Sequence, residues 1–147
     1  MSAEAVALMR AIRDCPEDDL PRLAYADYLA ENGDPDRGEF IRIQVDLSRL
    51  PDTDPRRREL EDREHELLAE NEPHWLDGLA SPEREVGGSG LHGWRWERGF
   101  VVDVAATPLA MLEHAADLFA DHPVRHWRVI SSEQDTAMPQ DLLEAGR

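Results

Sequence analysis

The sequence predicts an α+β fold, in which an N-terminal helical half of about four helices packs on a small C-terminal strand–helix–strand unit. Two observations lead to this prediction. Apolar residues recur at helical spacing through residues 1–80, whereas from Trp94 onward they alternate with polar residues, as in a strand. A glycine-rich segment, 81–93, separates the two patterns and is expected to be a flexible loop. The strand–helix–strand unit covers 94–130, a polar tail covers 131–147, and the whole chain fits one compact domain.

The first two helices are bounded by clear start and stop signals. Ser2 is a suitable N-cap for the first, and the dipeptide Cys15-Pro16 ends it, because a residue before proline avoids the helical region. Asp18 or Asp19 caps the second helix, and Asn32-Gly33 ends it. The apolar positions of the two helices are Ala5, Leu8, Met9, Ile12, Leu20, Leu23, Ala24, Tyr28 and Leu29.

The third and fourth helices begin with the same Asp-Pro dipeptide. Asp34-Pro35 restarts the chain, and Asp36 with Glu39 has the spacing of a capping box. The apolar surface over residues 40–50 is wide, which predicts a central helix packed on more than one side. Asp54-Pro55 opens a strongly charged fourth helix, which we expect to fray near Pro73.

The C-terminal unit begins with an alternating run from Trp94 to Val104, interrupted at Arg98-Gly99. This interruption predicts either a bulge or two short strands joined by a turn. Thr107-Pro108 starts a fifth helix, and residues 124–130 read as a further strand. A strand, helix and strand in succession predict a parallel, right-handed unit. The apolar face of the fifth helix is expected to comprise Leu109, Leu112, Ala116 and Phe119.

The charge balance excludes several classes of partner. There are 32 acidic and 16 basic residues, a formal net charge of −16, which argues against binding to nucleic acid or an anionic membrane. The one cysteine excludes an intramolecular disulfide, and no stretch approaches the ~18 apolar residues of a membrane span. The N-terminal residues lack the long apolar core of a secretory signal. We therefore expect a cytoplasmic protein.

One segment is distinctive: RLAYADYLAENGDPDRGEFIRIQVDLSRLP, residues 22–51. It resembles the bacterial repeat-companion domain, and the later runs ERGFVVDV and LFADHPVRHWRV extend the resemblance to roughly residues 4–130. That family sits N-terminal to leucine-rich-like repeats. The resemblance implies that the strand–helix–strand unit is a first solenoid repeat and that the helical half is its cap. It implies no catalytic residue. The matching positions are Arg22, Leu23, Tyr25, Ala26, Asp27, Leu29, Gly33, Asp34, Gly38, Glu39, Phe40, Ile41, Arg42 and Gln44.

The polar residues of this motif admit more than one interpretation. We interpret them as structural, forming helix caps and ion pairs that join the second and third helices. An alternative is that Asp27, Asp34 and Glu39 bind a divalent cation, which would make the chain a metal-dependent enzyme or regulator. Another is a recognition surface rich in Arg and Tyr. The motif residues concerned are Arg22, Tyr25, Asp27, Asp34, Glu39 and Arg42.

A binding surface is predicted on the strands of the C-terminal unit. Its aromatic members either belong to the core or form an exposed platform for a partner. The arginines beside them concentrate basic charge on an otherwise acidic chain, which favours an acidic partner or one that presents a strand or peptide. The predicted surface comprises Trp94, Trp96, Arg98, Arg125, Trp127 and Arg128.

Nucleophilic and metal-ion catalysis lack their usual signatures here. No G-x-S-x-G elbow, phosphate-binding glycine loop or metal-spaced histidine set occurs in the sequence. We therefore predict a non-enzymatic protein–protein interaction module without cofactor. The metal-dependent reading remains the alternative. The edge of the last strand is expected to be covered by the tail or by a partner.

Overall fold

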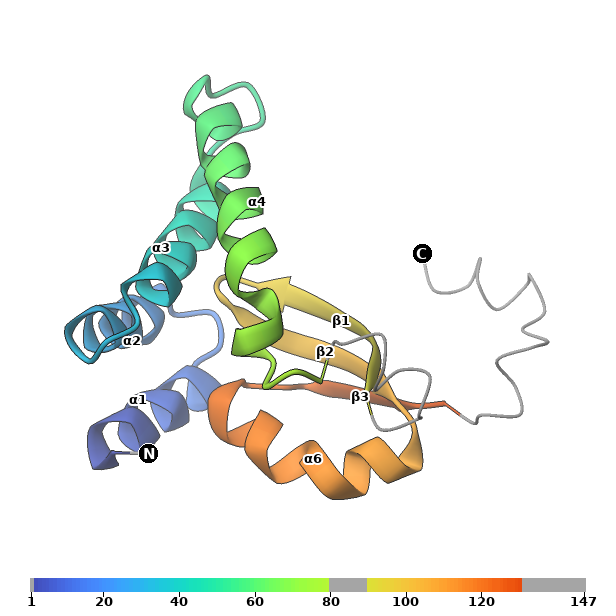
Figure 1. The fold of residues 1–147 in the computed structure, drawn as a ribbon. Helices are drawn as coiled ribbons and strands as arrows, with labels where there is room; N and C mark the ends of the chain where they lie inside the picture. Colours follow the sequence, from blue (N-terminus) through green and yellow to red (C-terminus); the bar gives the residue numbers. More distant parts are fainter. Residues whose placement is uncertain (1, 80–89, 131–147) are drawn as a thin grey trace, which may run out of the picture.

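The computed structural model describes residues 2–79 and 90–130, and the predicted tail and most of the predicted loop lie outside them. Within these described residues, four helices come first, followed by a three-stranded sheet with a further helix against it (Figure 1). This is the α+β arrangement that the sequence predicted. The helices are α1 (Ala3–Asp14), α2 (Asp19–Glu31), α3 (Pro35–Arg49), α4 (Arg56–Trp75) and α6 (Pro108–Asp121).

The sheet combines an antiparallel hairpin with a parallel crossover. Strands β1 (Leu91–Glu97), β2 (Phe100–Ala106) and β3 (His126–Val129) lie in the order β1-β2-β3. β1 and β2 are antiparallel, whereas β2 and β3 are parallel and are connected through α6, as the strand–helix–strand pattern predicted. β1 starts inside the segment expected to be loop, because Leu91 is buried and its N–H donates to the carbonyl of Leu79 at 2.8 Å.

The interruption at Arg98-Gly99 is the turn of this hairpin. Both residues have positive φ, 45° and 88°, as in a type I′ turn, whose twist matches that of the flanking strands. Of the two sequence alternatives, two strands joined by a turn is therefore correct. Separate irregularities of the ladder occur within β1, one of them between Arg95 and Trp96.

Four helices begin with a side-chain cap that the sequence announces. The side chains of Ser2, Asp18, Asp34 and Thr107 accept hydrogen bonds from backbone N–H groups in the first turns of α1, α2, α3 and α6. The capping box expected at Asp36 and Glu39 is wrong, because Asp34 is the N-cap and Pro35 opens the helix. The expected fraying at Pro73 is also wrong. α4 continues to Trp75, because Trp75 and Leu76 are buried and hold its last turn in the core.

Three buried clusters form the core, and β1–β2 residues join them. The first lies between α1, α2 and α3 and includes Phe100 of β2. The second lies between the sheet, α6 and the residues after α4, and the third lies between α3 and α4. Trp96 packs against both the second and the third. The hairpin is therefore the element that connects the helical half to the C-terminal unit.

α6 buries a different face from the one expected. Ala110 and Leu118 are buried against the sheet, whereas Leu112 is 86% exposed and Leu109 and Phe119 are exposed as well. The predicted apolar face is thus left open, since the sheet covers only one side of the helix. Among the described helices, none is long and apolar enough to cross a membrane.

Candidate functional site

The motif of the second and third helices converges on the hairpin turn. The guanidinium of Arg22, which is 1% exposed, donates to the carbonyls of Glu97 at 3.1 Å and of Arg98 at 3.3 Å. Arg37 donates through Nε and Nη2 to the carbonyl of Gly99, at 3.3 and 2.9 Å. The side-chain oxygen of Gln44 accepts the N–H of Gly99 at 2.7 Å. We call Arg22, Arg37 and Gln44 the clamp.

The close packing of the turn on α3 explains why residue 99 is glycine. A Cβ at this position would lie 2.4 Å from Cγ1 and 2.7 Å from Cα of Ile41, closer than real carbon atoms approach. The positive φ of Gly99 also disfavours any side chain. The turn therefore sits directly on the backbone of α3, and the clamp saturates its polar groups at that contact.

Arg37 is a buried cation that packs against three aromatic rings. It is 6% exposed, and its guanidinium carbon lies 5.2–5.5 Å from the ring centroids of Trp75, Trp96 and Phe100. Burial lowers the pKa of Arg37 to about 10, so the side chain stays charged at neutral pH. The negative faces of the rings stabilise this charge. Arg37 thus ties α3 to both strands of the hairpin.

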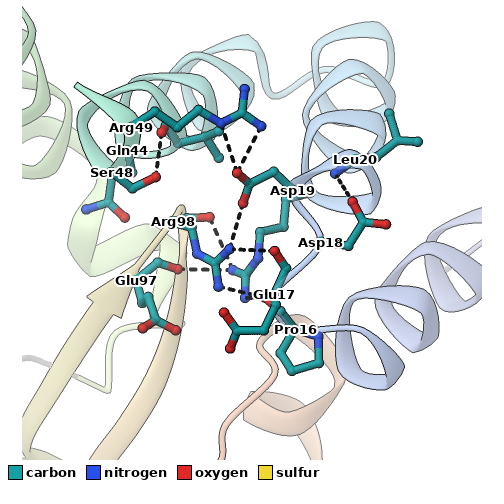
Figure 2. Close-up of polar contacts among 12 residues, drawn as sticks. Pro16, Glu17, Asp18, Asp19, Leu20, Gln44, Ser48, Arg49, Glu97 and Arg98 are labelled. Carbon is teal, nitrogen blue, oxygen red and sulfur yellow. Dashed lines mark hydrogen bonds and ion pairs between the residues drawn. The ribbon is translucent and has the colours of Figure 1, made fainter. Parts of the chain in front are cut away.

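Arg98 fixes the outer side of the same turn. Its side chain donates to the carboxylate of Asp19 at 2.7 Å and to the carbonyl of Pro16 at 2.6 Å, while Arg49 binds the other oxygen of Asp19 (Figure 2). Although burial alone raises the pKa of Asp19, the hydrogen bonds from Arg98 and Arg49 hold it below its ordinary value. Arg98 is therefore a structural contact between the turn and the start of α2.

The predicted Trp/Arg surface is not an open platform. The indole N–H groups of Trp94 and Trp96 both donate to one carboxylate oxygen of Glu72, at 3.1 and 2.7 Å, so both rings face α4. Trp127 is half-buried and packs on Phe119 of α6, with ring centroids 5.4 Å apart. These contacts favour the core interpretation for all three tryptophans.

The arginines of that surface are also largely engaged. Arg125 donates to the carboxylate of Glu97 at 2.7 Å, and Arg98 donates to Asp19 and Pro16. Arg128 on β3 is exposed. The expectation of concentrated, available basic charge is therefore wrong at Arg98, whose side chain is only 13% exposed.

The acidic residues of the motif are separated from one another by their partners. Asp27 pairs with Arg42 across α2 and α3, and Asp34 accepts the N–H of Arg37. Glu39 forms two hydrogen bonds of 2.9 Å with Arg63, which lower the pKa of its carboxyl. Over residues 2–79 and 90–130, no three His, Cys, Asp or Glu side chains lie close enough together to hold a metal ion. In this part of the chain, Asp27, Asp34 and Glu39 therefore do not form a metal-binding site.

Sequence reasoning did not identify the roles of two polar residues that hold the site together, the buried His122 and the partly buried Gln44. His122, the C-cap of α6, has its ring in the core, where Nδ1 accepts the N–H of Val101 at 3.1 Å and Nε2 faces the carbonyl of Trp75 at 3.3 Å. Burial lowers the pKa of His122 well below its usual value. Gln44 was noticed only as a motif position. A polar residue between the apolar Ile43 and Val45 was the available signal for Gln44, and nothing in the sequence indicated that His122 is buried.

An acidic groove lies between α1, α2, α6 and the turn after α4. Two adjoining cavities, of about 170 and 750 Å³, share Tyr25, Leu29, Asp77 and Asp121 as lining residues. Burial first, and then the nearby Asp77, raise the pKa of Asp121 above its ordinary value. Asp34, Asp77, Asp117 and Asp121 line the two cavities together with one arginine, Arg37, so the groove carries a net negative charge.

No family model, curated protein or solved structure matches the chain.

Proposed function

We propose that the chain is a non-enzymatic protein–protein interaction module that acts in the cytoplasm, as the cap of a leucine-rich-like solenoid, and that it is a repeat-companion domain. The observation that supports this proposal most directly is the open end of the β2–α6–β3 unit. A solenoid repeat cannot bury its apolar face alone and needs a neighbour on that side.

The exposed face of α6 is apolar and is available to a neighbouring element. Leu109, Leu112 and Phe119 are spaced three and seven residues apart along the helix, which places them on one face, and they are 50%, 86% and 37% exposed. Trp127 packs beside Phe119 and extends the apolar surface toward β3. Apolar side chains spaced in this way along one face are typical of a helix that packs against a further helix.

The edge of β3 is available to a further strand. β3 is the last strand of the sheet, and within the described part of the chain it pairs only with β2. Val129 on this strand is 53% exposed. A parallel strand followed by a helix, added in the next position, would bury both the edge and the face of α6. The partner we propose is therefore a strand–helix repeat, in the same chain or in another.

Affinity capture with two matched variants tests this proposal. Leu112→Asp places a charge on the open face of α6, and Leu20→Asp places one on α2, where the leucine is also 71% exposed. We expect the wild type and Leu20→Asp to retain the same stoichiometric partner from native lysate and Leu112→Asp to lose it. Amide exchange of residues 126–129 should slow in the complex. A partner retained by Leu112→Asp, or an unchanged β3, would contradict the proposal.

A further inference from the structure

Three arginines from separate segments line one small cavity. Its volume is about 220 Å³, and it lies between the end of α1, the loop before α2, β2 and the loop before β3. Arg13, Arg22 and Arg125 provide its polar lining, and proline and valine side chains, including Val102 and Pro123, provide the rest. None of the described residues that line the cavity is a carboxylate. This concentration of positive charge occurs in a chain whose formal net charge is −16.

Contacts within the protein do not neutralise the charge of these three arginines. Arg125 forms an ion pair with Glu97 at 2.7 Å. Arg13 donates only to the carbonyl of His122, at 3.4 Å, and no ion pair is found for it in the described structure. Arg22 donates to backbone carbonyls, so its charge meets no carboxylate directly. Counting Glu97 against the three guanidinium groups leaves the cavity with a net excess of two positive charges.

Arg22 also has a donor without an acceptor. Its Nε is buried and has no hydrogen-bond partner, in a side chain that is 1% exposed. Burial, together with the nearby charges of Arg98 and Arg125, lowers the pKa of Arg22 to about 10, so the group stays cationic at neutral pH. Because this Nε lies inside the protein, an anion in the cavity would interact with the Arg22 guanidinium through its charge and not through this donor.

The dimensions and the donor type select the kind of anion. The cavity is smaller than the ~300–1,000 Å³ of sites that enclose drug-sized ligands, so it accepts a small group rather than a polymer. The planar fork of arginine matches the paired oxygens of a phosphate. Apolar walls at Val102 and Pro123 lower the local dielectric and strengthen such contacts.

We propose that the cavity between Arg13, Arg22 and Arg125 is a binding site for a phosphate group, carried by a small phosphate-bearing ligand. The site is distinct from the face of α6 and the edge of β3 that carry the proposed function. Binding would join α1, α2 and the loop before β3 through one anion. The bound group would therefore stabilise the contact between the helical half and the C-terminal unit.

Phosphate titration of four matched proteins tests the proposal. Arg13→Gln and Arg125→Gln each remove one cavity cation from a partly exposed side chain, and both should fold. Arg128→Gln removes an exposed arginine that lies three positions after Arg125 and does not line the cavity, so it is the control. Arg22→Gln is not used, because Arg22 holds the hairpin turn and the variant would fail for that reason.

The readouts are ³¹P line broadening and isothermal titration with inorganic phosphate and pyrophosphate at constant ionic strength. We expect saturable binding to the wild type and Arg128→Gln, and at least a tenfold loss of affinity in Arg13→Gln and Arg125→Gln. Competition by a phosphoserine peptide, compared with pyrophosphate, distinguishes a protein-borne phosphate from a free one. Equal responses from all four proteins, no saturable binding, or binding of malonate with no response to phosphate would overturn the proposal.

Discussion

Replacing Gly99 with alanine tests how closely the hairpin turn packs on α3. Gly99 has a φ of 88°, and the added Cβ would lie 2.4–2.8 Å from three atoms of Ile41, one of them in the helix backbone. Gly33 provides a matched control. It also has a positive φ, 99°, but a Cβ there would meet nothing within 4 Å. The pair separates the conformational cost from the steric cost.

The expected magnitudes follow from these two costs. A left-handed conformation costs a non-glycine residue about 1–2 kcal/mol, and this is the expected loss of unfolding free energy for Gly33→Ala. Overpacking adds about 1–3 kcal/mol at Gly99, because Ile41 is buried and α3 cannot move away freely. Gly99→Ala should therefore lower the free energy of unfolding by about 2–5 kcal/mol. This is a large share of the total, since a domain typically has an unfolding free energy of about 5–15 kcal/mol.

Urea unfolding followed by tryptophan fluorescence and far-UV circular dichroism measures both variants. We expect the midpoint of Gly99→Ala to fall well below that of Gly33→Ala, with an unchanged slope against urea concentration. Equal midpoints would show that the turn does not contact α3 closely, and the clamp would then lose its main structural support.

Two further predictions concern groups whose pKa the fold changes. Burial lowers the pKa of His122, so the neutral side chain contributes its full stabilisation above about pH 6.5, and this contribution is lost as the pH falls below that value. In urea titrations, the difference in unfolding free energy between wild type and His122→Gln should therefore shrink between pH 7 and pH 5. The raised pKa of Asp121 means that its ionised form is unfavourable in the folded state at neutral pH. Asp121→Asn should therefore raise the melting temperature at pH 7 and lose this advantage near pH 3. Asp117→Asn, at an exposed position, is the control and should change the melting temperature less. A melting temperature of Asp121→Asn that is lower than wild type at pH 7 would contradict the second prediction.

The functional conclusions depend on where the tryptophans and arginines lie. As sequence, Trp94 and Trp96 are compatible with either a platform or a core. The shared carboxylate of Glu72 decides for the core, and it comes from a helix more than twenty residues earlier in the chain. The open apolar surface lies instead on α6, where the sequence pattern had predicted a buried face, and on β3.

Local rules predicted the parts of this protein that depend on neighbouring residues. Ser2, Asp18 and Thr107 cap helices, because a cap needs only the N–H groups two or three positions ahead. The parallel crossover through α6 also follows from a short stretch of sequence, whereas the interruption at Arg98-Gly99 left a bulge and a hairpin turn as alternatives.

The tertiary structure alone decided which partners the polar motif residues meet. The sequence analysis placed Arg22 among ion pairs that join the second and third helices, but Arg22 and Arg37 donate to carbonyls of the hairpin turn, 62–76 residues away in sequence. The same holds for α6, whose buried side is set by the position of the sheet and not by its own apolar period. Sequence periodicity reports that a face is apolar. Whether that face is covered depends on which distant surface reaches it, because burial is a property of two packed elements and not of one.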